Sequence, residues 1–306
     1  MMLAWRDPLM ENLQKEWMRR VIFLIALVLL VVFHGCAKDF VTGKSTLNYY
    51  NINDEPKIGT QVLTAQEASI KAKGKKLDEA ADPVEYARLK RIVARLAAVS
   101  HYPNFPYEVH LADVDVVNAW CAPGGKVMVY TGLWDPKKGL VEKGNDDQLA
   151  AVLAHEIAHA TARHVTESIS NAMTISMVGA AVQTAIAAGG SSQGADVFGQ
   201  VFGSGMDLYI PSYSRKNELE ADRIGLFYMA KAGYDPRAAV ELWKKAATMK
   251  KDRTSIFTSH PSNGMRAREL EKLLPEAMAM YEQAKAAGNM PEKSAAEPKP
   301  GKKRTN

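Results

Sequence analysis

Two histidines and a glutamate in one short segment have the types and spacing that best fit a chemical role. The segment is His155-Glu156-Ile157-Ala158-His159. Helical positions four apart differ by about 40° around the axis, so the two imidazoles share one face. Two imidazoles on one face can bind a single zinc ion, and Glu156 can then take a proton from water held there. Such a pattern arises by chance in roughly one chain in a hundred of this kind, so it needs support from elsewhere.

A cluster of three acidic residues further along the chain offers that support. Glu218, Glu220 and Asp222 follow about sixty residues later; Glu218 and Asp222 share a helix face, whereas Glu220 points elsewhere. A catalytic zinc takes three protein ligands and keeps one position open. We therefore expect Glu218 to be the third ligand and Asp222 to accept the second N–H of a ligand histidine. An isolated cluster of this kind is more often a plain helix surface, but its position after the two histidines favours the metal centre.

Three segments together resemble one group of metallopeptidases. They are HEIAHATARH (155–164), SRKNELEAD (214–222) and TSHPSNGMR (258–266). They are similar to the gluzincin peptidases of the Ste24 and HtpX type, and above all to the small periplasmic lipoproteins among them, which also have Cys-Ala and Val-Thr-Gly segments like those at 36–37 and 41–43. The resemblance implies a zinc endopeptidase that holds one Zn²⁺ per chain.

The same resemblance implies roles for individual residues. His155, His159 and Glu218 would be the metal ligands, Glu156 the general base, and Asp222 the acid of the second motif. A catalytic role is also expected near the metal for His260, which would either stabilise the oxyanion of the tetrahedral intermediate or cap the zinc in a latent state.

Two further features lie near these motifs. His164 projects about 160° from the ligand face if the helix is straight, so we expect it to be a structural hydrogen-bonding histidine rather than a ligand. The segment 118–130 resembles the edge strand beside a gluzincin cleft. Its residues Asn118, Ala119 and Gly125 are therefore candidates for a substrate strand, to which an extended peptide would add through its backbone.

Hydrophobic periodicity and capping residues predict the elements that carry these groups. We expect helices over 54–75, 82–99, 146–165, 212–232, 236–250 and 263–286, and strands over 107–112, 115–120 and 125–131. The predicted fold class is α+β, a mainly helical gluzincin-like metallopeptidase domain with one small β-sheet beside the active-site helix. Residues 168–195 carry no charge. They form either a membrane-inserted hairpin or, as we favour, a buried helix followed by a flexible loop.

The amino-acid composition excludes several other classes of protein. The chain has 306 residues, of which 47% are apolar and 24% charged, which excludes a disordered, collagen-like or polytopic membrane chain. Two cysteines exclude a disulfide scaffold and a cysteine-rich zinc site. The net charge of +5 is concentrated in the tail 288–306, which has five basic and two acidic residues. We therefore expect no nucleic-acid partner.

The N-terminal segment predicts export. Residues 21–33 form an apolar run that would span only about 20 Å as a helix. Arg19 and Arg20 precede the run, and Gly35-Cys36 follow it. This pattern is typical of a signal peptide over 1–35, with Cys36 as a lipidation site; the alternative is an uncleaved anchor helix. Met18 is also a natural start, in which case 1–17 would lie upstream of the coding start.

We thus expect a signal peptide over 1–35, a zinc metallopeptidase domain over 36–287 and a disordered basic tail over 288–306. The expected protein faces the periplasm of a bacterial cell envelope, lipid-anchored with the outer membrane favoured. It would hydrolyse unfolded or extended polypeptides, specifically misfolded or misassembled envelope proteins. Two alternatives remain open: an envelope chaperone or assembly factor with a latent zinc site, and a zinc hydrolase acting on non-peptide bonds.

Overall fold

The computed structural model describes residues 36–186, 213–249, 256, 260 and 264–291, with five isolated positions between 15 and 22. Nearly all of the predicted signal peptide and most of the predicted tail lie outside these residues. The strands are β1 (Cys36–Lys38), β2 (Ser45–Leu47), β3 (Glu108–Ala112), β4 (Ala119–Ala122) and β5 (Lys126–Tyr130). The helices are α2 (Glu55–Ala72), α3 (Pro83–Val99), α4 (Asp146–Thr161), α5 (His164–Ile186), α7 (Arg215–Lys231), α8 (Arg237–Thr248) and α10 (Gly264–Ala286).

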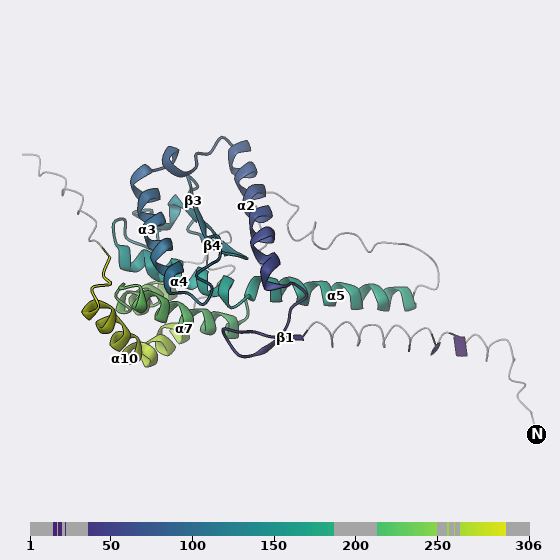
Figure 1. Ribbon diagram of the computed structural model, residues 1–306. Coiled ribbons are helices and arrows are strands. Elements are labelled where there is room, and N and C mark those ends of the chain that lie inside the picture. The colour runs from purple at the N-terminus through teal and green to yellow at the C-terminus, as the bar shows by residue number, and fades with distance from the viewer. Residues whose placement is uncertain are drawn as a thin grey trace, which may run out of the picture.

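The predicted fold class is confirmed, because helices surround one small sheet of three strands. The strand order is β3-β5-β4, with β5 parallel to β3 and antiparallel to β4. Figure 1 shows the sheet between α2 and α3, with α4, α7 and α10 grouped on one side and α5 extending away from the body. A separate hairpin of β1 and β2 pairs Cys36 with Leu47.

The alternation of side chains along the strands divides the core into two layers. Trp120, Met128 and Tyr130 face α2 and pack with its residues Val62 and Leu63. The side chains between them along the strands face the other way, into a larger core with α3, α4, α7, α8 and α10. Because successive strand residues point to opposite faces, one short sheet serves both layers. The helix that carries the two histidines therefore lies directly against the sheet, as the sequence predicts.

Two predicted elements differ most from the structure in their boundaries. The strand expected over 115–120 is β4, Ala119–Ala122, because its partner β5 ends at Tyr130, where the chain turns into the 3-10 helix Thr131–Trp134. The helix expected over 146–165 ends at Thr161, and α5 begins at His164. Arg163 breaks it with a φ of 59°, a left-handed conformation that non-glycine residues adopt only under constraint.

Buried polar partners supply that constraint. The Arg163 side chain donates to Glu55 Oε1 at 2.7 Å and to the carbonyl of Tyr50 at 2.5 Å, and Glu55 is fully buried. An unpaired carboxylate in this position would be costly, so the pair fixes the turn between α4 and α5.

The uncharged segment is helical as far as the structure describes it. Residues 168–186 lie in α5, and 187–195 fall outside the described residues. Ile169 and Ser170 are buried as expected for a buried helix, whereas Ile175 is 73% exposed. Across the described part of the chain, no helix is both long enough and apolar enough to cross a bilayer.

A glycine allows α4 and α7 to approach closely. A Cβ atom at Gly225 of α7 would lie 2.9 Å from the backbone N of His155 and 3.0 Å from the carbonyl carbon of Ala154. Neither backbone atom can move without shifting α4 itself. Gly225 therefore sets the distance between the two helices that carry the predicted metal ligands.

We predict that Gly225→Ala lowers the free energy of unfolding by about 1–3 kcal/mol, because the added methyl group forces the two helices apart. Urea denaturation of the full-length protein measures this loss. Gly264→Ala is the matched control, since a Cβ there meets only Arg268 Nη1 at 3.5 Å. Wild-type stability in Gly225→Ala would contradict the packing argument.

Candidate metal centre and active site

The two histidines of α4 and one glutamate of α7 meet in the core. His155 Nε2 and His159 Nε2 lie 3.1 Å apart. Glu218 Oε1 is 3.3 Å from His159 Nε2, and Glu218 Oε2 is 3.6 Å from His155 Nε2. All three side chains are almost fully buried.

These distances fit a zinc ion. Tetrahedral zinc with bonds of 2.0–2.1 Å holds its ligand atoms about 3.3 Å apart, close to the spacings in this cluster. Two imidazole nitrogens that face each other at 3.1 Å cannot both use their lone pairs favourably unless a proton or a cation lies between them. The donor set of two imidazoles and one carboxylate also matches catalytic zinc sites.

The pKa shifts of the three predicted ligands also favour the binding of a metal ion. Burial lowers the pKa of His155 and lowers that of His159 well below its ordinary value. Burial alone would raise the pKa of Glu218, but His260 and Arg266 outweigh it and hold that pKa well below the usual range. Neutral imidazoles with an ionised carboxylate are the protonation states that a divalent cation requires of its ligands.

Asp222 lies where the sequence predicts, behind His155. Its Oδ1 is 3.0 Å from His155 Nδ1. Arg266 of α10 donates to both oxygens of Asp222, at 2.7 and 2.6 Å, and its Nη1 lies 2.6 Å from Glu218 Oε2. Arg266 therefore contacts both the predicted ligand Glu218 and Asp222, the carboxylate beside His155.

Glu156 is buried beside this cluster. The backbone N–H of Cys121 hydrogen-bonds its carboxylate, while Glu156 Oε1 makes no hydrogen bond to the residues that the structure describes. Burial raises the pKa of Glu156 to about 7, and the negative charge of Glu218 also acts to raise it. A carboxylate with a pKa near neutrality can both accept and return a proton.

His260 also lies at the cluster, although it is far from α4 in sequence. Its Nδ1 is 3.0 Å from Glu218 Oε1 and 3.2 Å from His155 Nε2, and its Nε2 is 3.5 Å from Glu156 Oε1. One ligand atom from each of His155, His159, Glu218 and His260 fits within 4.8 Å of the others. Burial opposes protonation of His260, but Glu156 and Glu218 outweigh it and raise its pKa.

β4 is the outer strand of the sheet beside Glu156, and its four residues are buried. Asn118 accepts the N–H of Tyr130, so in the antiparallel ladder Ala119 and Cys121 direct their backbone groups away from β5. Gly125 lies in the turn, where its N–H and carbonyl bond Ala122 and Glu108. Of the three predicted substrate-strand residues, only Ala119 therefore directs its backbone groups away from the sheet at this edge, and Cys121 does the same.

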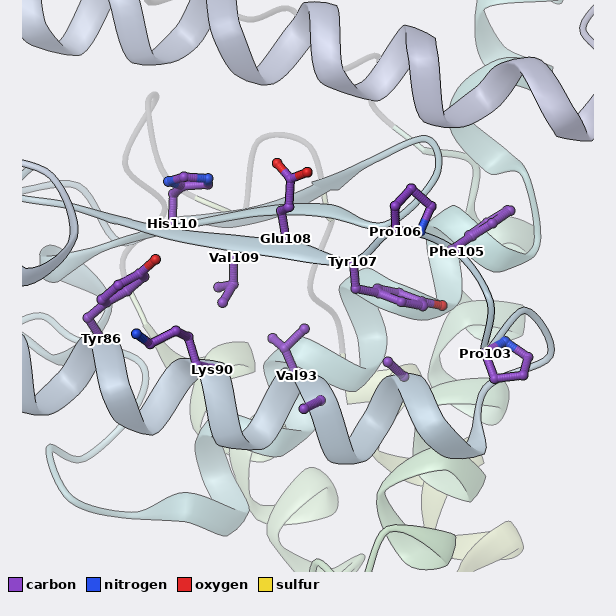
Figure 2. Close-up of a pocket in the computed structure, with 12 residues that line it drawn as sticks. Tyr86, Lys90, Val93, Pro103, Phe105, Pro106, Tyr107, Glu108, Val109 and His110 are labelled. Atoms are coloured by element: carbon purple, nitrogen blue, oxygen red, sulfur yellow. The ribbon is translucent and has the colours of Figure 1, made fainter.

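A surface groove lies at the opposite edge of the sheet. Its volume is about 730 Å³, and Figure 2 shows Val109 of β3 and Tyr107, just before this strand, pointing across it toward Val93 of α3. Glu108 and His110 point to the other side of the strand. No residue of the metal cluster lines this groove, so it is separate from the chemistry described above.

Three other residues of the site were not predicted. The ring of Tyr213 stacks on His159 at 3.9 Å between centroids, and the guanidinium of Arg266 lies 3.6 Å from the ring centroid of Trp243. Arg266 belongs to the third motif, which was the available signal. Tyr213 and Trp243 carry no motif and are found only from the structure.

Comparison with known proteins agrees with this geometry. The arrangement is that of a zinc metalloendopeptidase. The chain belongs to peptidase family M48, whose model matches residues 83–274. The mitochondrial metalloendopeptidase OMA1 of Schizosaccharomyces pombe is 37% identical over 199 residues, which cover 63% of this chain and 54% of that protein. The beta-barrel assembly-enhancing protease of Yersinia pestis is 28% identical over 168 residues, covering 54% and 33%.

The resemblance read from the sequence is thus confirmed at the level of the family, zinc cofactor and endopeptidase class. The relatives found carry the names of OMA1 and of the beta-barrel assembly-enhancing protease, not of the Ste24 or HtpX type. The chain spans about half of the first of these relatives and a third of the second.

We predict that Asp222→Asn weakens zinc binding by about 10- to 100-fold, because the ring of His155 loses its charged partner. Competition with a chromophoric chelator measures this affinity. Asp113→Asn, at an exposed position of the same residue type, should bind zinc like the wild type. Unchanged affinity in Asp222→Asn would show that Asp222 does not orient the ligand.

Proposed function

We propose that the protein is a membrane-tethered endopeptidase of a bacterial envelope, facing the periplasm, that cleaves misfolded or misassembled envelope proteins. The observation that carries the catalytic part is Glu156, buried with one unbonded carboxylate oxygen beside the cluster of His155, His159 and Glu218. The substrate class is supported by the relatives named for enhancing the assembly of β-barrels.

The proposed mechanism assigns a task to each residue of the site. His155, His159 and Glu218 hold the zinc, which when bound polarises the scissile carbonyl and lowers the pKa of water. Glu156 accepts the proton of the attacking water and delivers it to the leaving amine. The N–H of Cys121 holds the carboxylate of Glu156 in this position.

We propose that substrates bind as an extra strand beside β4. The outward backbone groups of Ala119 and the outward carbonyl of Cys121 would pair with an extended peptide, while the N–H of Cys121 is used by Glu156. Recognition through backbone groups does not depend on the substrate's side chains. It therefore suits a protease whose substrates share an unfolded state and not a sequence.

The tether is proposed from the sequence. The apolar run 21–33 ends shortly before Cys36, so lipidation of Cys36 and an uncleaved anchor would both keep β1 near a membrane surface. The outer membrane is favoured because Ala37, not an aspartate, follows the cysteine.

We predict that Glu156→Gln retains zinc but lowers cleavage of unfolded casein by at least about 100-fold, because amide replaces the general base. The full-length protein in detergent should be tested for metal content and casein hydrolysis. Glu142→Gln, an exposed substitution of the same type, serves as the control. Near-wild-type cleavage by zinc-loaded Glu156→Gln would refute the mechanism.

A second function, an envelope assembly factor with a latent zinc site, is favoured by one observation. His260 Nδ1 lies at the cluster in the position of a fourth ligand, 3.0 Å from Glu218 Oε1. A histidine bound there would occupy the position that a catalytic zinc keeps open. We therefore propose the capping role for His260 over the stabilisation of an oxyanion.

On this proposal His260→Ala speeds casein cleavage. A rise of about tenfold follows if the uncapped form makes up about a tenth of the wild-type population. Steady-state hydrolysis at matched zinc content measures the effect, and adding Glu156→Gln should abolish the gain. Equal or slower cleavage by His260→Ala with zinc retained would reject the cap and favour the oxyanion role.

A further inference from the structure

The two ligand histidines are held in different ways. His155 Nδ1 contacts the carboxylate of Asp222 directly, whereas His159 Nδ1 contacts another imidazole, Nδ1 of His164, at 2.9 Å. His164 is buried, and its other ring nitrogen, Nε2, lies 3.4 Å from Glu220 Oε2. The other oxygen of Glu220 forms an ion pair with Lys44 Nζ.

The break between α4 and α5 creates this contact. On a straight helix, His164 would point away from the face that carries His159. The left-handed conformation of Arg163 turns the chain there, and His164 returns beside the ligand. The ion pair of Arg163 with Glu55 thus positions His164.

The hydrogen bonds along this path have one consistent direction. If His159 binds zinc through Nε2, its Nδ1 carries the proton and donates to His164 Nδ1. His164 must then carry its own proton on Nε2, which donates to Glu220. Glu220 accepts, and the ammonium group of Lys44 compensates its charge.

We propose that His164, Glu220 and Lys44 are positioning residues that fix the ring and tautomer of His159, and that the β1–β2 hairpin completes this chain. The proposal rests on the assignment of His159 as a zinc ligand made above. Outer partners of this kind orient a metal-bound imidazole and raise its basicity.

The turn of the hairpin is built to present Lys44. The buried Asp39 accepts the N–H groups of Val41 and Thr42 at 3.0 and 2.7 Å, and Gly43 adopts a φ of 68°. The N–H of Asp39 also donates to the carbonyl of Lys44 at 2.7 Å. The Val41-Thr42-Gly43 segment therefore has a physical task, which is to close the turn that holds Lys44 toward α7.

The hairpin is also anchored to α5. Asn48, just after β2, donates to Thr166 Oγ1 at 2.8 Å, and the N–H of Tyr49 donates to Ser170 Oγ at 3.0 Å. The segment that begins at Cys36 is therefore tied to α5, which begins at His164, and through Lys44 to α7. Through this path, a change in the hairpin can alter the zinc ligand His159.

The test compares zinc affinity, by chelator competition, in the full-length variants Lys44→Met, Glu220→Gln and His164→Phe. His164→Phe should weaken zinc binding by about 10- to 100-fold, since His159 loses its acceptor. Glu220→Gln and Lys44→Met should weaken it less but in the same direction. The double variant Lys44→Met/Glu220→Gln should lose no more than Glu220→Gln alone, because the two residues act in one chain.

Further readouts separate positioning from general stability. The absorption spectrum of the cobalt-substituted protein should change in Glu220→Gln, and kcat should fall with KM unchanged, while the zinc-free protein keeps its wild-type unfolding midpoint. His164→Gln, which restores an acceptor, should recover part of the affinity. Lys38→Met, an exposed lysine of the same hairpin, should match the wild type.

Wild-type zinc affinity and cobalt spectrum in both Lys44→Met and Glu220→Gln would overturn the proposal. His159→Gln separates this failure from a wrong metal site. If His159→Gln loses zinc while the other variants keep it, only the positioning chain is wrong. If His159→Gln also keeps its zinc, the proposed metal centre itself is wrong.

Discussion

The structure depends on burying carboxylates in a core that must be neutral overall. Glu156, Glu218 and Asp222 are all buried within the packing of α4 and α7, and Arg266 is the buried guanidinium that contacts two of them. Three carboxylates and one guanidinium leave two formal negative charges, which a divalent cation, together with His260, can offset. Burying such charges without compensation would cost several kcal/mol each. The same groups that perform the chemistry are therefore stable only because they share cations.

The protein brings these groups together with few elements. α4 supplies both imidazoles and Glu156, α7 supplies Glu218 and Asp222, and α10 joins them through Arg266. The small sheet supports α4 from one side and places its outer strand β4 next to Glu156. Gly225 allows the two central helices to approach closely enough for ligands on both to reach one ion. Catalytic geometry is thus a direct consequence of helix packing.

Much of this was predictable because the decisive signals are local in sequence. The spacing of His155 and His159 and of Glu218 and Asp222 is a property of single helices, and capping residues such as Asp82 and Asn145 mark where helices begin. That the two motifs share one metal ion was predicted from the ligand requirements of zinc and from the family resemblance. In the structure, their side chains lie close enough to bind one ion.

The missed features have non-local causes. The break at Arg163 depends on Glu55, more than a hundred residues earlier, and β4 begins only at Ala119 because its partner β5 ends at Tyr130. Helical periodicity could place His164 only on a straight helix, so its contact with His159 could not be predicted from the sequence. Tyr213 and Trp243 stack on the site from positions with no pattern of their own. Nor could motifs shared by a whole family distinguish relatives of OMA1 from those of the Ste24 type.

A crystal structure of the purified protein, with anomalous data collected on both sides of the zinc absorption edge, would locate the metal. We expect one anomalous peak per chain within bonding distance of His155 Nε2, His159 Nε2 and the carboxylate of Glu218. A zinc peak elsewhere, or one at the histidines with Glu218 turned away from it, would show that these three side chains do not form the metal centre.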